Sequence, residues 1–171
     1  MGEIRSTMDI IMEKARGLEI TDEDKNAIRR KEIEDRLKIM INKYLDGEYD
    51  IEDLKIKIKK INNQEIAINM AIKECIAKIG IESDNGKLID LIKDFNEALA
   101  RSIEDTIGKF NKKIREERRK REEIIRNSLK KEDIEGSALI VNVNADVLWR
   151  KFIRDMNRKF STKLEGILNT I

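Results

Sequence analysis

The sequence predicts an all-α protein, an elongated helical bundle or antiparallel coiled coil of about five helices, one of them very long. Three observations predict this fold. The chain of 171 residues contains no proline, which would interrupt helices. Charged residues make up 41% of it. Apolar residues recur along most of it at alternating spacings of three and four, as on one face of an α-helix. The length fits a single domain, residues 1–171.

The first two predicted helices each carry a narrow apolar seam. Residues 4–18 form the first helix, which ends near Gly17. The second begins at Thr21, whose hydroxyl can accept a hydrogen bond from a free backbone amide, and ends at Asp46 and Gly47. Its first turns are largely polar, so we expect them to project into solvent or to contact a partner. The seams are Ile4, Met8, Ile11, Ala15 and Leu18 in the first helix, and Ile33, Leu37, Met40 and Tyr44 in the second.

The third segment, residues 50–79, has the most regular heptad pattern in the chain. We predict one continuous helix, because the phase of the pattern is kept throughout. Two alternatives are open. Residues 54–58 also alternate with period two, as in a strand, and Asn62 can cap a new helix together with Glu65, which would divide the segment there. Glu65 occupies a seam position, so it either fixes the register against another helix or lies in water where the helix breaks.

The fourth predicted helix runs from about Lys87 to Lys131, after a loop at residues 80–86. A helix of about 45 residues is about 67 Å long, whereas a compact domain of this size has a radius of gyration of about 15 Å. We therefore expect the highly charged residues 109–131 to protrude as a helical arm. The alternative is a bend near Gly108 or in the charged run 115–123.

The sequence pattern in the last part of the chain predicts one more helix. Residues 136–143 are the least helical stretch and form either a short strand or an apolar linker, although a lone strand is marginal. Asn144 is expected to cap the helix that follows. The apolar face of this helix is Trp149, Phe152, Ile153, Met156, Phe160, Leu164, Ile167 and Ile171.

The composition excludes several classes of chemistry. There is no histidine, so Ser-His-Asp catalysis, Cys-His catalysis and histidine metal sites are ruled out. The lone cysteine, Cys75, lies in an apolar seam and is expected to be a buried hydrophobic residue. We predict that the protein is not an enzyme and has no catalytic residue, no cofactor-binding residue and no metal site. No stretch resembles a known family closely enough to indicate a function.

The formal net charge of +2 hides an uneven distribution. Residues 1–108 carry 19 Lys/Arg and 24 Asp/Glu, residues 109–131 carry 11 and 4, and residues 132–171 carry 6 and 6. Clustered cations bind phosphates because neutralising phosphates releases counterions. The alternative is a solvated helix held by local ion pairs, such as Glu117–Arg121 and Glu122–Arg126. The candidate polyanion-binding residues are Lys112, Lys113, Arg115, Arg118, Arg119, Lys120, Arg121 and Arg126.

The leading functional prediction is a non-enzymatic structural or interaction protein. Long narrow seams bury little within one chain, so we expect a homodimer that completes them as a coiled coil. The alternative is a module that binds nucleic acid or another polyanion through residues 109–131. An unidentified protein or nucleic acid is the expected partner. The unpaired cysteine favours a reducing cytoplasm, and no charge-free run is long enough for a membrane span.

Overall fold

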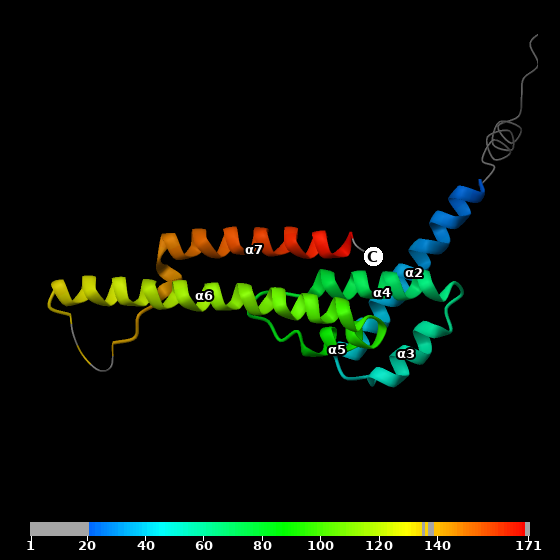
Figure 1. The fold of residues 1–171 in the computed structure, drawn as a ribbon, viewed down its shortest axis with the longest axis horizontal. Coiled ribbons are helices and arrows are strands. Elements are labelled where there is room, and N and C mark those ends of the chain that lie inside the picture. Colours follow the sequence, from blue (N-terminus) through cyan, green and yellow to red (C-terminus); the bar gives the residue numbers. More distant parts are fainter. Residues whose placement is uncertain (1–20, 135, 137–138, 170–171) are drawn as a thin grey trace, which may run out of the picture.

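The computed structural model describes residues 21–134, 136 and 139–169. These residues confirm the predicted all-helical bundle, which is elongated (Figure 1). The predicted helix at residues 4–18 lies outside the described part of the chain. The described residues form six α-helices and one short 3-10 helix: α2 (Asp22–Leu45), α3 (Ile51–Lys59), α4 (Gln64–Lys78), α5 (Gly86–Phe95), α6 (Glu97–Lys131), η1 (Val143–Ala145) and α7 (Val147–Leu168).

Helix α2 begins and ends where the sequence predicts. Thr21 and Asp24 form a capping box, in which the Asp24 amide donates to the Thr21 hydroxyl at 3.1 Å and the Thr21 amide donates to the Asp24 carboxylate at 3.1 Å. The helix ends at Asp46, and Gly47 follows at φ +82°, a left-handed conformation that glycine adopts without strain. The polar first turns, residues 22–32, are exposed and project from the bundle (Figure 1).

The prediction of one continuous helix over residues 50–79 is wrong. Helix α3 ends at Lys59, and α4 begins at Gln64 after a turn in which Asn63 is left-handed at φ 64°. Asparagine tolerates this conformation better than most residues, which explains why the chain turns here. The residue that precedes α4 is Asn63 and not Asn62, and its side chain makes no capping hydrogen bond. Glu65 is exposed in the first turn of α4, where its negative charge interacts favourably with the positive end of the helix dipole.

The predicted helix from Lys87 to Lys131 is also divided, at Asn96. The Asn96 amide still donates to the Ile92 carbonyl at 2.7 Å, which closes α5. Its own backbone is extended, and its side-chain oxygen accepts from the Leu99 amide at 3.0 Å, which starts α6. One residue therefore ends one helix and caps the next. The apolar spacing continues across the break, so the sequence pattern gave no sign of it.

Helix α6 then continues for 35 residues without a break, a length of about 52 Å. The chain bends neither at Gly108 nor in the charged run. Helix α7 packs antiparallel along α6 from the level of Arg121 back to the first turns of α6, and the last turns of α6 extend beyond the start of α7 (Figure 1).

The connection to α7 differs from the prediction in one cap. Residues 139–142 form no strand, which agrees with the linker alternative over the part described. Asp146 and not Asn144 caps α7, because its side chain accepts from the Leu148 amide at 2.8 Å. The Asn144 side chain instead accepts a hydrogen bond from the Trp149 indole N–H at 3.1 Å. Asn144 therefore lies in η1 and positions the tryptophan.

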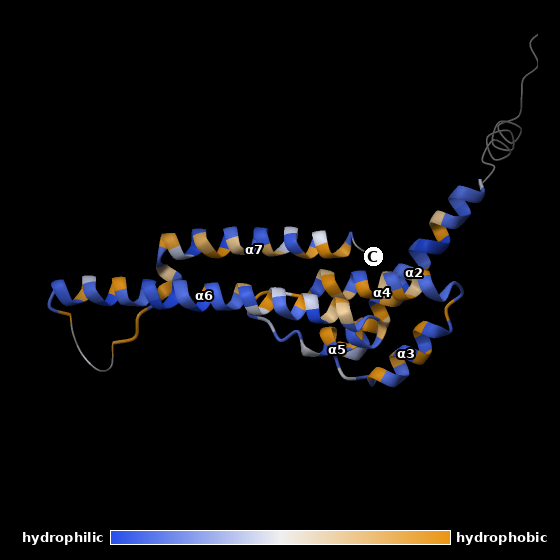
Figure 2. Ribbon diagram, in the orientation of Figure 1, coloured by the Kyte–Doolittle hydropathy of each residue, from blue (hydrophilic) through white to orange (hydrophobic). Residues whose placement is uncertain are grey.

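The apolar seams of the described helices pack against one another inside the chain. Helix α4 packs on α2, α3 and α5, and α6 lies between α5 and α7. Figure 2 shows orange apolar faces turned inward along these helices. The main core includes the predicted seam residues Leu37, Met40 and Tyr44 of α2 and Ile103 of α6. Burial of such residues stabilises the fold by roughly 1.5–3 kcal/mol each.

A second, smaller core joins the middle of α6 to the beginning of α7. Its buried members are Ile114, Val143, Trp149 and Met156. This core fixes the position of α7 on α6 next to the basic segment.

Candidate polyanion-binding surface on helix α6

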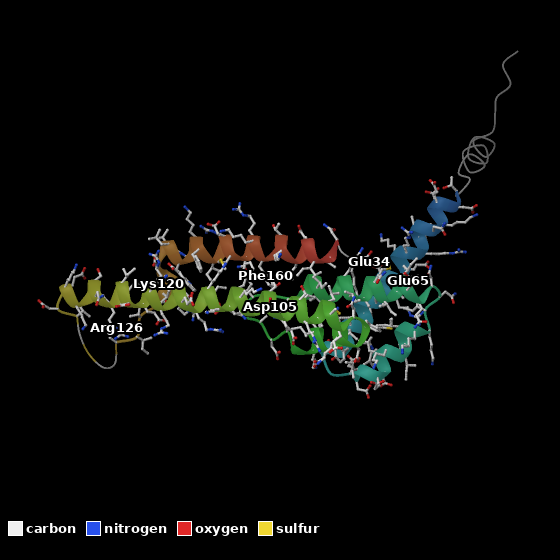
Figure 3. All side chains as sticks on the ribbon, in the orientation of Figure 1. Glu34, Glu65, Asp105, Lys120, Arg126 and Phe160 are labelled. Carbon is white, nitrogen blue, oxygen red and sulfur yellow. The ribbon has the colours of Figure 1, made fainter. Side chains whose placement is uncertain are left out.

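The packing of α7 decides which side of α6 faces solvent. The Phe110 and Phe160 rings meet edge to face, with centroids 5.3 Å apart, and Ile114 is 1% exposed. Phe160 lies between the two helices in Figure 3. Because side chains repeat every 3.6 residues, the residues on the far side of α6 from Phe110 and Ile114 are exposed to water.

Four cations gather on that exposed side. They fall within about 60° of the helix circumference and span about 21 Å along its axis, since the helix is unbroken. Each of them is exposed. Figure 3 shows Arg126 on the side of α6 that faces away from α7. We call these residues, Lys112, Arg115, Arg119 and Arg126, the α6 strip.

The cations of the α6 strip are not neutralised by ion pairs with the described residues. Among the residues that the structure describes, no carboxylate lies within ion-pair distance of its four members. The predicted Glu117–Arg121 pair is formed at 3.0 Å. The predicted pair between Glu122 and Arg126 is not formed in this described region. Exposed i, i+4 pairs contribute only a few tenths of a kcal/mol, so its loss costs little stability.

Arg121 and Arg118 contact protein groups instead of lying free on the surface. Arg121 is half-buried, with its side chain 22% exposed, and lies between Glu117 at 3.0 Å and Asp146 at 3.8 Å. It therefore links α6 to the residue that caps α7. The Arg118 guanidinium lies over the Trp149 ring, 5.2 Å from its centroid, a cation–π arrangement.

The remaining two predicted residues lie on another side of the helix. Lys113 and Lys120 are exposed on the flank of α6, about a quarter turn from the α6 strip. The Lys113 ammonium is 6.0 Å from the centroid of the Phe110 ring. The eight predicted residues therefore do not form one surface: four form the strip, two flank it and two contact the α7 region.

The surface offers no aromatic ring for stacking on bases. Trp149 is 3% exposed and stacks on Phe152, with ring centroids 5.8 Å apart. None of the seven aromatic residues, all of which are described, is in the exposed class. The α6 strip can therefore attract phosphates, but it cannot read bases by stacking.

A second group of cations, on α7, was not predicted from the sequence. Residues 147–168 carry six Lys/Arg and two Asp/Glu, a net charge of +4. The segment 132–171 had a net charge of zero because four acidic residues lie in the connection before α7. Summing charge over each predicted helix, without its preceding loop, would have shown the basic helix.

Other candidate chemistry finds little support in the described residues. Cys75 is 0% exposed, and burial raises the pKa of its thiol to about 12, which disfavours the reactive thiolate. No group of three or more metal-ligating residues is found in the part of the chain that the structure describes. In the same part, every helix is too short or too polar to cross a membrane.

Comparisons of the chain with models of protein families, with curated proteins and with solved structures found no match.

Proposed function

We propose that this protein is a non-enzymatic nucleic-acid-binding protein whose α6 strip contacts the phosphate backbone. The observation that supports it most is the geometry of α6. An unbroken helix holds Lys112, Arg115, Arg119 and Arg126 in one exposed row, and none of the described carboxylates pairs with them. Arginine and lysine in such a row can neutralise successive phosphates and release their counterions.

A linear polyanion fits this row better than a membrane surface does. A helix that lies on a membrane pairs its basic side with a broad exposed apolar side. The apolar side of α6 is occupied by α5 and α7 over much of its length. Because exposed aromatic residues are also lacking, binding should depend on phosphates rather than on base sequence.

Fluorescence anisotropy of a labelled duplex against salt concentration tests the proposal. Four phosphate contacts on B-DNA predict a slope of log affinity against log salt of about −3.6, or a loss of roughly a hundredfold between 50 and 200 mM. Duplex DNA and duplex RNA of unrelated sequences should bind similarly. Absence of binding at 50 mM, or affinity that does not change with salt, would refute the proposal. Binding only to vesicles of anionic lipid would assign the α6 strip to membranes instead.

Self-association is the second candidate function, and α2 is where it finds support. Residues 22–32 are exposed over three turns, and Ile28 and Ile39 are 52% and 58% exposed on the same side of α2. The predicted seams of the described helices pack within the chain, so a dimer formed by the described residues would have to use this other surface. Sedimentation velocity at micromolar concentration tests self-association. A dimer that dissociates when Ile28→Asp and Ile39→Asp are introduced supports it, and a monomeric wild-type chain counts against it.

A further inference from the structure

Helix α7 carries a second row of exposed cations on its outer side. Trp149, Met156 and Phe160 point toward α6 and are at most 6% exposed. At 100° per residue, Lys151, Arg154 and Arg158 lie on the opposite side of the helix, and Arg150 lies on the flank next to them. Nitrogen-tipped side chains project from the side of α7 that faces away from α6 in Figure 3. We call the four exposed residues Arg150, Lys151, Arg154 and Arg158 the α7 strip.

The two strips lie on different sides of one two-helix arm. Phe110 and Phe160 pack at its centre, and each strip faces away from that contact. Two packed helices are about 20 Å thick with their side chains, so polyanions on the two outer sides would not collide. The net charge is +7 over residues 109–131 and +4 over α7, whereas residues 1–108 have a net charge of −5. A single long polyanion would contact only one strip along a straight path.

We propose that the arm formed by α6 and α7 bridges two nucleic-acid duplexes, one on the α6 strip and the other on the α7 strip. This inference rests on the proposed function and adds a second site to it. The α7 strip is the weaker of the two sites. It spans about 12 Å, compared with about 21 Å for the α6 strip. In addition, the Arg158 guanidinium lies 3.9 Å from the carboxylate of Asp155, which reduces its free charge.

The experiment measures single-duplex binding and bridging separately, on the full chain at 50 mM salt. Anisotropy of one labelled duplex gives the affinity. Capture of a fluorescent duplex by beads that carry a second, unlabelled duplex gives the bridging. The test variant is Arg150→Glu with Arg154→Glu. The matched control is Lys159→Glu with Lys163→Glu, which makes the same charge change at exposed residues of α7 outside the strip.

We expect the wild-type chain and the control to capture the fluorescent duplex. The test variant should lose at least tenfold in capture, while its affinity for one duplex changes by less than about threefold. Capture by the test variant equal to that by the wild type would overturn the proposal and indicate bridging by two copies of the chain. Binding without capture by the wild-type chain would also overturn it, while leaving the proposed function intact. Absence of any binding would contradict the proposed function itself.

Discussion

Cationic side chains of the same type take different roles on α6 according to their position around the helix. Arg121 lies toward α7 and pairs with Glu117 and Asp146, and Arg118 covers the Trp149 ring. Arg115 and Arg119 lie on the far side, where they are exposed and form no ion pair with any residue that the structure describes. Composition alone cannot distinguish these roles, because all four residues belong to the same charged run. Proximity to α7, which is a tertiary contact, makes the difference.

Cys75 provides a prediction at the scale of one residue. Burial raises the pKa of its thiol to about 12, so native protein at pH 8 should react with a thiol reagent only when it unfolds. Modification in urea should be complete within seconds, and modification of the native chain should be slower by at least a hundredfold. Because the folded thiol stays protonated, the free energy of unfolding should also fall as the pH rises above about 9, where the unfolded thiol ionises. Rapid modification of the native chain would contradict the burial of Cys75.

Helix boundaries were predictable from the sequence where one residue controls them locally. Thr21 caps α2 as predicted, and α3 begins after Asp50, where the third segment was predicted to start, because a capping side chain three residues from a free amide needs no tertiary contact. The breaks at Asn63 and Asn96 were not predicted as observed, since the apolar spacing keeps its phase on both sides of each. Asn144 was mistaken for a cap because Asp146, two residues later, competes for the same role. Which of two such residues caps a helix depends on the packing of Trp149.

Gly108 tests the continuity of α6 at the scale of the element. A β-carbon at Gly108 would contact nothing within 4 Å, and glycine inside a helix is less stable than alanine by roughly 0.5–1 kcal/mol. Gly108→Ala should therefore raise the free energy of unfolding by that amount in urea denaturation. Gly47→Ala is the matched control. It should lower stability by about 1 kcal/mol, because Gly47 is left-handed at φ +82°. Destabilisation by Gly108→Ala would indicate that α6 bends at this residue.

At the scale of the whole molecule, charge is separated along the bundle. The basic arm of α6 and α7 extends from a body in which α2 to α5 pack on the first half of α6 (Figure 1). The sequence predicted half of this separation, the basic segment 109–131. The other half, α7, was hidden because its cations and the acidic residues before it were summed together. The two basic rows belong to one arm because α7 packs antiparallel on α6. No local sequence pattern specifies this packing.

The affinity of an α6-strip variant for duplex DNA tests the central proposal most directly. The variant is Arg115→Glu with Arg119→Glu, and its control is Arg29→Glu with Arg30→Glu at exposed residues of α2, where the charge change is the same. Circular dichroism should show equal helicity for both variants. At 100 mM salt we predict that the α6 variant binds at least tenfold more weakly than the wild-type chain, because two phosphate contacts are lost. The control should stay within about threefold. Equal affinity of the α6 variant and the wild type, or equal weakening of both variants, would contradict a phosphate-binding surface on α6.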